Sequence, residues 1–446
     1  MRDPVVAIAT PLGESAIAAI RVTGDDCLSM MQALIGDFAP VPRKALHVVL
    51  RNPEDSSPLD DVIVIYYKSP ASYTGEDMIE IFCHGGLVSV QTIYENLLQI
   101  GFKSAPPGEF TKRAVYNGKM DIFQAESVEQ IVRARSKEEV ELSVQTLKGK
   151  LTRTFKDILQ QVSSIQVKIE ARISFPDDIE EDDQEIFSDI NHVTKTIENH
   201  LYAHTYIQKI QKGFSITLMG RTNVGKSTLF NTLVGYDRTL VSPYPSTTHD
   251  YVSEEVLWDG YSIHLYDTAG YIADATQPLD IIFNERMQSL FDSSFLLVYI
   301  LDTVDFRKDD LLLIDQYKRS NMILVVNKTD ISSPDPSWIK QLPHHLPMIE
   351  ISAKNKTGID ELIQHIAHTI KESLGKVPEY YINQRQFYVL QQINSILQSI
   401  DSSSNPFLDQ IAEDFQEIVY ILKEELDVSH NPKLLEEIFS RFCIGK

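Results

Sequence analysis

The stretch GRTNVGKS at residues 220–227 matches the pattern G-x-x-x-x-G-K-[ST], which closes a loop around phosphate groups. Residues 215–219 before it form a candidate strand, and residues 228–233 after it begin a candidate helix. Glycines let backbone N–H groups approach phosphates, and a helix N-terminus adds partial positive charge. The stretch therefore predicts a nucleotide-binding domain in which strands alternate with helices.

Two side chains of this loop have expected roles. Lys226 should reach the β and γ phosphates, and the Ser227 hydroxyl should ligate Mg²⁺. Further contacts to the phosphates are expected from neighbouring positions: Asn223, Val224, Gly225 and Thr228. A match of this length also arises by chance, so the residues that follow decide its meaning.

A second motif, DTAG at residues 267–270, follows the candidate strand 261–266. Its carboxylate should hold Mg²⁺ through water, and its glycine N–H should sense the γ phosphate. Either Thr247 or Thr248, which lie between the first two motifs, should complete the Mg²⁺ shell. All four residues of the second motif are expected at the nucleotide: Asp267, Thr268, Ala269 and Gly270.

Two more motifs predict which base is bound. Asp330, in the NKTD motif at 327–330, can accept hydrogen bonds from guanine N1–H and the 2-amino group together, a donor pair that adenine lacks. Asn327 should meet the acceptor edge of the base, and Lys328 should lie along the ring. The motif Ser352-Ala353-Lys354 follows a further candidate strand and should donate a backbone N–H to guanine O6. GTP is therefore expected rather than ATP.

Four motifs in this order and at workable spacing argue against chance matches on a structural fold. The arrangement resembles the TRAFAC-class GTPases, whose G domain is a mostly parallel sheet with helices on both faces. The resemblance implies a Ras-like P-loop G domain that hydrolyses GTP.

The negative charge that develops on the phosphates in the transition state has to be stabilised by a positively charged group in this site. The residue after the second motif is Tyr271, where many GTPases carry a water-orienting Gln, and no Arg is evident as a finger in cis. Asn223 occupies the loop position at which K⁺-dependent GTPases carry a cation-binding Asn, a resemblance that implies the same role. The alternative is an Asn that only stabilises the turn.

The same resemblance implies a K⁺ loop over residues 242–248, in which backbone carbonyls of Ser242, Tyr244 and Thr247 are further ligands. Ser246 and His249 depart from the Gly-Thr-Thr-Arg-Asp of those GTPases. A Gly at the first of these positions can take a positive φ that Ser resists.

The pattern of apolar and turn-forming residues changes three times along the chain, which predicts four segments. Residues 1–118 alternate short β-rich runs (5–9, 16–22, 61–67 and 78–83) with turn signals. Residues 119–213 carry an apolar stripe at helical spacing over 151–173. Strand and helix patterns alternate over 214–375, and helical stripes return over 376–446. The simplest interpretation is an α/β domain, then one helical domain in two parts with the G domain inserted between them.

The chain has 446 residues and a net charge of −22. Such a surface repels a phosphate backbone on average, so any RNA is expected to be held by a basic partner or a local basic patch. The acidic run at 177–183 is either a solvated face or a partner-docking segment. Neither a membrane-spanning run nor a signal-peptide pattern is found, and three scattered cysteines fit a reducing compartment, so a cytoplasmic protein is expected.

The whole chain resembles one family, the tRNA modification GTPases MnmE, also called TrmE. The motifs that carry this resemblance are DPVVAIATP (3–11), RVTG (21–24), SYTGED (72–77), HGG (84–86), GEFTKR (108–113), NGKMD (117–121) and FCIGK (442–446).

The family resemblance implies an N-terminal domain that dimerises and binds a reduced folate of the formyl-tetrahydrofolate type. Its contacts would be Arg21, Glu80, Lys119 and Lys446, because Arg and Lys suit folate carboxylates and Glu suits pterin N–H donors. Without the resemblance, each would be an ordinary surface ion pair. Cys443 is either a low-pKa thiol or a structural or dispensable cysteine.

By alignment with the family, the catalytic acid that orients water is Asp280, where the family has Glu, and Glu285 is the fallback. The implied catalytic set is Asp280, Lys226 and Thr248. Asp is one methylene shorter than Glu, which shortens its reach to a water.

The resemblance further implies a homodimer whose G domains meet, and a flavoprotein partner, MnmG (GidA), that grips most of the tRNA. Together they would add an aminomethyl or carboxymethylaminomethyl group to C5 of the wobble uridine U34. One alternative is a ribosome-assembly GTPase with a KH domain, but residues 376–446 contain one glycine, Gly445, and no G-x-x-G loop. Another is a nucleotide-gated scaffold, which folate binding by residues 1–118 would distinguish.

Overall fold

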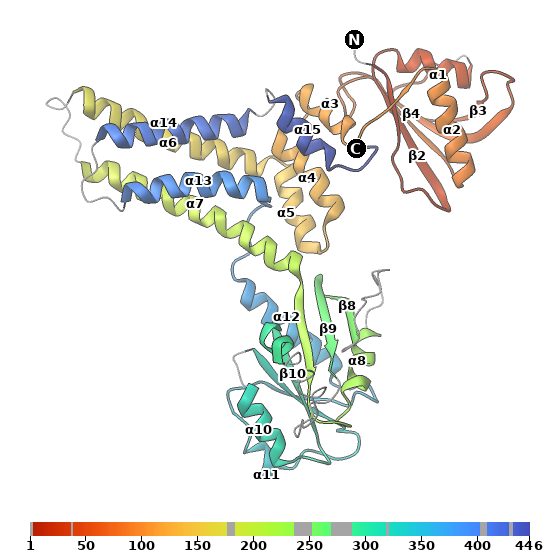
Figure 1. The fold of residues 1–446 in the computed structure, drawn as a ribbon. Coiled ribbons are helices and arrows are strands. Elements are labelled where there is room, and N and C mark those ends of the chain that lie inside the picture. Colours follow the sequence, from red (N-terminus) through yellow and green to blue (C-terminus); the bar gives the residue numbers. More distant parts are fainter. Residues whose placement is uncertain are drawn as a thin grey trace, which may run out of the picture. The chain divides into compact units, whose positions relative to one another are not determined.

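The computed structural model describes residues 3–36, 39–175, 183–235, 252–268, 288–317, 321–401, 408–427 and 431–446. The chain forms two compact units. The first contains residues 1–133, 143–199 and 384–446, and the second contains residues 134–142 and 200–383. Each is described here by itself (Figure 1).

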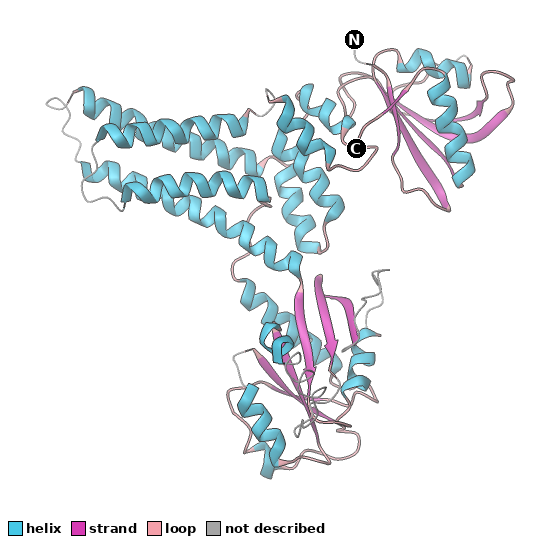
Figure 2. Ribbon diagram, in the orientation of Figure 1, coloured by secondary structure: helices cyan, strands magenta, loops and turns pink. Residues whose placement is uncertain are grey.

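The first unit begins with a six-stranded sheet in the order β3-β4-β5-β2-β1-β6, antiparallel except for the β1–β6 pair. Its strands are β1 (Val5–Ile8), β2 (Ser15–Thr23), β3 (Ala45–Arg51), β4 (Pro58–Tyr67), β5 (Met78–Gly85) and β6 (Lys103–Ser104). Helices α1 (Cys27–Ile35) and α2 (Leu87–Gln99) cover one face, as Figure 2 shows. The four strand runs expected from the sequence are present as β1, β2, β4 and β5, whereas β3 and β6 were not expected.

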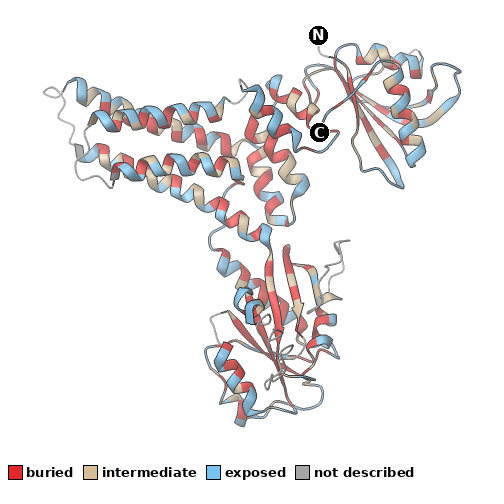
Figure 3. Ribbon diagram, viewed as in Figure 1, coloured by how far each residue is buried: buried red, intermediate tan, exposed pale blue. Residues whose placement is uncertain are grey.

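Buried and exposed residues alternate along the strands of this sheet (Figure 3). The face opposite the helices carries exposed apolar side chains. On β4, Val62 and Val64 are buried against the helices, whereas Ile63 between them is 45% exposed. Ile17 on β2 and Val49 on β3 are 62% and 38% exposed on the same face as Ile63, because their cross-strand partners place them there. The sheet therefore leaves one partly apolar face open.

Helices make up the rest of the first unit and continue into the second. They are α3 (Glu109–Tyr116), α4 (Ile122–Arg133), α5 (Lys137–Leu147), α6 (Lys150–Ser174), α7 (Asp183–Lys212), α13 (Gln384–Asp401), α14 (Leu408–Leu426) and α15 (Pro432–Ser440). The expected apolar stripe of α6 is buried, from Leu151 to Ile169, and the helix ends before Phe175-Pro176. Figure 1 shows α6 lying along α14, whose stripe from Ile411 to Leu422 is also buried.

The second unit holds a six-stranded sheet in the order β12-β11-β10-β7-β9-β8, parallel except for the β8–β9 hairpin. Its strands are β7 (Phe214–Met219), β8 (Val252–Trp258), β9 (Tyr261–Asp267), β10 (Leu296–Asp302), β11 (Met322–Asn327) and β12 (Met348–Glu350). Its helices are α8 (Lys226–Val234), α10 (Lys308–Tyr317), α11 (Pro336–Ile339) and α12 (Ile359–Leu374).

Every residue of β10 and β11 is buried, since the parallel sheet has apolar clusters on both faces. The carboxyl ends of the parallel strands therefore meet at one edge, where ligands bind in such sheets. The expected fold class is confirmed: an α/β N-terminal domain, a helical domain and a P-loop G domain. Within the described ranges, no helix is long and apolar enough to cross a membrane.

Candidate functional site

The phosphate loop joins β7 to α8 and depends on left-handed backbone at three positions. Gly220, Asn223 and Gly225 have φ of 150°, 66° and 100°. A Cβ on Gly225 would lie 2.3 Å from the Asn327 side-chain nitrogen, so this position excludes any side chain. Asn tolerates a left-handed conformation better than most residues, which suits Asn223 to its turn.

Lys226 lies inside this loop and is 7% exposed. Its ammonium group donates to the carbonyls of Gly220 (3.1 Å) and Arg221 (2.7 Å). Burial lowers the pKa of Lys226, although the Asp267 carboxylate acts in the opposite direction. A phosphate group in the loop would provide the negative charge that this buried cation lacks.

Asn327 connects the phosphate loop to the two guanine-selecting motifs at residues 327–330 and 352–354, together called the base loop. Its Nδ2 donates to the Val224 carbonyl (2.9 Å), and its Oδ1 accepts from the Ala353 N–H (3.0 Å). The side chain is 3% exposed, so both ends of the amide are used inside the protein. The expected contact with the acceptor edge of the base stays a prediction.

The other base-loop residues are also fixed by hydrogen bonds. Lys328 forms an ion pair with Asp302 (2.6 Å) and donates to the Asn223 carbonyl (2.9 Å). Asp330 accepts from the Ser352 hydroxyl (2.6 Å), which places the two guanine-selecting motifs side by side. Lys354 is exposed beside them.

The part of the site that is expected to hold Mg²⁺ contains a buried carboxylate, one oxygen of which accepts no hydrogen bond from the described residues. Asp267 ends β9, and its Oδ1 is buried without a hydrogen-bond partner among the described residues. Thr268 beside it donates to the Leu218 carbonyl (2.7 Å). Ser227 and Thr228 are exposed at the start of α8. An orphan carboxylate oxygen suits a metal-bound water, so these residues fit Mg²⁺.

Sequence reasoning missed the anchor of Arg221. Its guanidinium contacts Asp310 through Nε (2.8 Å), the Asp305 carboxylate through Nη1 (3.3 Å) and the Asp305 carbonyl through Nη2. Asp310 is fully buried and also accepts from the Tyr299 hydroxyl (3.0 Å). The one Arg of the phosphate loop is therefore committed to holding the loop against the start of α10.

Several expected site residues lie outside the described part of the chain. They are Ser242, Tyr244, Ser246, Thr247, Thr248, Ala269, Gly270, Asp280 and Glu285.

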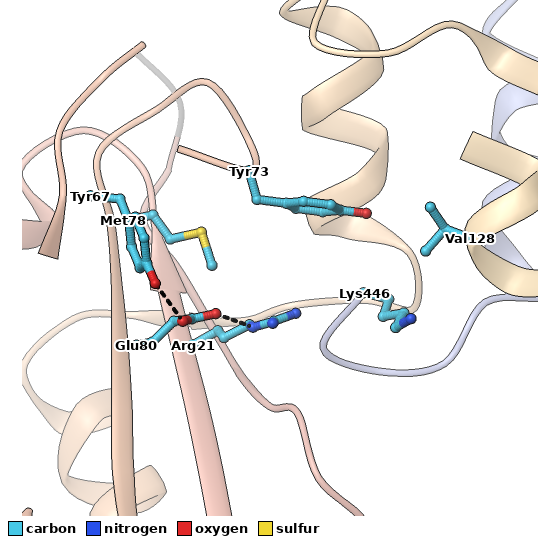
Figure 4. Close-up of a pocket in the computed structure, with 7 residues that line it drawn as sticks. All are labelled: Arg21, Tyr67, Tyr73, Met78, Glu80, Val128 and Lys446. Carbon is cyan, nitrogen blue, oxygen red and sulfur yellow. Dashed lines mark hydrogen bonds and ion pairs between the residues drawn. The ribbon is translucent and has the colours of Figure 1, made fainter. Parts of the chain in front are cut away.

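The first unit contains a separate cavity of about 320 Å³ that brings together three of the four expected folate contacts (Figure 4). Glu80 accepts from the Arg21 guanidinium (2.9 Å) and the Tyr67 hydroxyl (3.1 Å). Lys446 lines the same cavity, and burial lowers its pKa, with a further contribution from Arg21. Sequence reasoning missed the remaining lining residues, Tyr67, Tyr73, Met78 and Val128.

The chain end is fixed close to this cavity. The Arg21 guanidinium donates to the Gly445 carbonyl (3.2 Å), and a Cβ on Gly445 would lie 2.7 Å from the Ala9 Cα. The terminal Gly-Lys therefore needs glycine to pack against β1. Lys119 is not among the lining residues, and its ammonium group donates to the Pro70 carbonyl (3.0 Å).

Comparison with known proteins gives matches over the whole chain. The model of the GTP-binding protein TrmE N-terminus matches residues 4–119, and the model of the MnmE helical domain matches residues 122–443. Among solved structures, the G domain of the FeoB iron transporter of T. maritima covers 35% of this chain at 23% identity and a TM-score of 0.29.

Curated relatives match from end to end. The tRNA modification GTPase MnmE of Pseudothermotoga lettingae is 35% identical over 452 residues and covers 100% of both chains. The MnmE of Thermotoga maritima is 32% identical over 451 residues with the same coverage. The MnmE of Fervidobacterium nodosum is 33% identical over 454 residues, covering 100% of this chain and 98% of that one. With both of its family models and these full-length relatives in agreement, the chain belongs to the MnmE (TrmE) family of tRNA modification GTPases.

Proposed function

We propose that this chain hydrolyses GTP with K⁺ as the stimulating cation and, with the flavoprotein MnmG (GidA), adds an aminomethyl or carboxymethylaminomethyl group to C5 of U34 in certain tRNAs. The observation that carries the nucleotide part is the Asn327 amide, which joins the phosphate loop at Val224 to the base loop at Ala353. A cradle for a guanine nucleotide is thus preformed. Family membership supplies the tRNA context.

Mg²⁺ would be held by the Ser227 hydroxyl and, through water, by Asp267, whose Oδ1 is otherwise unused among the described residues. Either Thr247 or Thr248 completes this shell. Lys226 binds the β and γ phosphates, because it is already directed into the loop that would surround them. Bound Mg²⁺ would neutralise charge on those phosphates.

A cation other than Arg221 has to stabilise the transition state, because Arg221 is tied to Asp305 and Asp310. K⁺ fills this role in the proposal. Asn223, exposed at the rim of the loop, contributes its side-chain oxygen. Carbonyls of Ser242, Tyr244 and Thr247 complete the set, and Asp280 orients the attacking water, with Glu285 as the alternative.

The cavity at Arg21, Glu80 and Lys446 is proposed to bind a reduced folate of the formyl-tetrahydrofolate type. Two cationic groups suit the folate carboxylates, and the Glu80 carboxylate suits N–H donors of the pterin. Tyr67 and Tyr73 offer aromatic surface to the flat ring. Lys119 stays a proposed contact from outside the cavity.

We also propose that the chain is a homodimer. The open face of the N-terminal sheet supports this, since Ile17, Val49 and Ile63 are exposed together on it. The proposed domains are residues 1–118 for dimerisation and folate, 119–213 with 376–446 for the helical domain, and 214–375 for the G domain. The tRNA is held largely by the partner, in keeping with the net charge of −22.

Reconstitution tests the proposal. Purified chain, MnmG, GTP, a reduced folate, a nitrogen donor and tRNA are incubated, and the mass of U34 is measured. We expect a modified U34 that disappears when GTP, MnmG or this chain is omitted. GTP hydrolysis and folate binding with unmodified U34 would instead favour a nucleotide-gated scaffold.

A further inference from the structure

A second cavity, of about 400 Å³, lies in the helical part of the first unit. Val389 and Gln392 of α13 line one side, and Tyr420, Glu424 and Glu425 of α14 line the other. Leu434 of α15 also lines the cavity. None of these residues belongs to the nucleotide site or to the proposed folate cavity.

Glu425 is the buried charged group of this cavity. It is 5% exposed, and its Oε2 accepts from Nη1 of Arg385 (2.5 Å). Its Oε1 is buried and has no hydrogen-bond partner among the described residues. Burial of an unpaired carboxylate oxygen costs free energy that a ligand cation could recover.

The charges around Glu425 do not balance. Arg385 forms a bidentate pair with Glu126 through Nε and Nη2, both at 2.9 Å. Both oxygens of the Glu126 carboxylate therefore accept a hydrogen bond from this guanidinium. Gln386 donates a further hydrogen bond to Glu126 (2.7 Å). Two buried carboxylates thus share one Arg, and the cluster carries one excess negative charge unless a proton or a cation is added.

The side chains at the rim of the cavity suit a cationic ligand. Glu424 is an exposed carboxylate at the opening, and the Tyr420 ring beside it is 62% exposed. An aromatic face next to carboxylates attracts guanidinium and ammonium groups. Val389 and Leu434 would contact the methylenes of a long cationic side chain.

We propose that this cavity binds a guanidinium or primary ammonium group, whose charge is balanced by Glu425. The group would be presented by a side chain of a protein partner or by a free polyamine.

The groups that face Glu425 make binding depend on pH. Burial raises the pKa of Glu425 to about 7, against the lowering effect of Arg385 and with a further rise from Glu126. Below this pKa the carboxyl is neutral and offers no charge to a cation. Affinity for a permanently charged ligand should therefore rise about tenfold from pH 6 to pH 8, as the ionised fraction grows from about 0.1 to about 0.9.

Thermal unfolding of the full chain, followed against ligand concentration at constant ionic strength, tests this inference. The probes are N-acetyl-arginine methylamide and putrescine, and the neutral control is N-acetyl-citrulline methylamide. We expect at least one cation, but not the citrulline compound, to raise Tm, and to do so with about tenfold higher affinity at pH 8 than at pH 6. A response to the arginine compound alone identifies a protein side chain as the source, and a response to putrescine alone identifies a free amine.

Two variants make the test specific. Glu425→Gln removes the charge, and Val389→Trp fills the cavity without touching the charged cluster. Both should abolish the response, whereas Glu413→Gln, an exposed carboxylate on the same helix, should preserve it. Equal responses to the arginine and citrulline compounds, or a cation response that survives in both variants, would overturn the proposal.

Discussion

Asp330 is the residue on which base selection depends. Its carboxylate accepts a hydrogen bond from the Ser352 hydroxyl at 2.6 Å, and the residue is exposed. Asp330→Asn exchanges an acceptor for a donor, so we expect GTP affinity to fall about a hundredfold, since charged hydrogen bonds contribute about 1.5–3 kcal/mol each. Xanthosine triphosphate, which presents an acceptor in place of the 2-amino donor, should bind better than GTP. Competition binding measures both, and unchanged GTP affinity would refute this placement of the base.

Arg221 anchors the phosphate loop through a fully buried carboxylate, Asp310. Arg221→Met leaves that carboxylate without its cation, so we expect a loss of about 3 kcal/mol of unfolding free energy in the G domain and weaker GTP binding. Arg307→Met is the matched control, because Arg307 pairs with Asp305 at the surface and is 59% exposed. Chemical denaturation and nucleotide titration check both variants. Similar losses in the two would show that the buried anchor has no special role.

The sequence predicted the site residues that lie within continuous motifs. It missed contacts between residues that are distant in the chain and meet only in the folded protein. The phosphate loop and the base motif are each continuous in sequence, so their residues could be named in advance. Arg221 and Asp310 are far apart in sequence, and no spacing rule joins them. Tyr73 and Val128 were missed for the same reason, because the cavity they line forms only when the N-terminal sheet meets α4.

Secondary structure was easiest to predict where one pattern dominates. The apolar stripe of α6 is long and regular, and the helix is present as expected. β3 escaped prediction because it is an edge strand with one fully buried residue, Leu50. Edge strands carry little apolar alternation, so periodicity alone detects them poorly.

The turn from the phosphate loop into α8 leaves no room for a side chain at Gly225. Gly225→Ala would force a Cβ to within 2.3 Å of the Asn327 side chain at a φ of 100°, which breaks the bridge between phosphate and base loops. We expect GTP affinity to fall at least about tenfold, since a strained residue costs about 1–3 kcal/mol. Gly86→Ala, where a Cβ meets nothing within 4 Å, should bind GTP normally. Calorimetric titration compares them, and equal affinities would exclude the steric argument.

The proposed homodimer concerns the whole molecule. If the open sheet face is the interface of the proposed dimer, Ile63→Glu places a charge in that interface, because Ile63 is 45% exposed on β4, and we expect a monomer. Val167→Glu, at a 64% exposed position on α6, is the control and should remain dimeric. Light scattering after gel filtration gives the mass of each. A dimeric Ile63→Glu variant would move the interface elsewhere.

Stimulation of GTP hydrolysis by K⁺ can be measured directly on the purified chain. GTP hydrolysis is measured in K⁺ and in Na⁺ at equal ionic strength, for the natural chain and for Asn223→Gly. Glycine accepts the φ of 66° found at this position, so the substitution keeps the turn and removes the side-chain amide, with the oxygen proposed to bind K⁺. We expect K⁺ to accelerate hydrolysis by the natural chain at least about tenfold over Na⁺, and Asn223→Gly to lose this gain. A rate that ignores the cation, or a glycine variant that keeps its response to K⁺, would contradict this expectation.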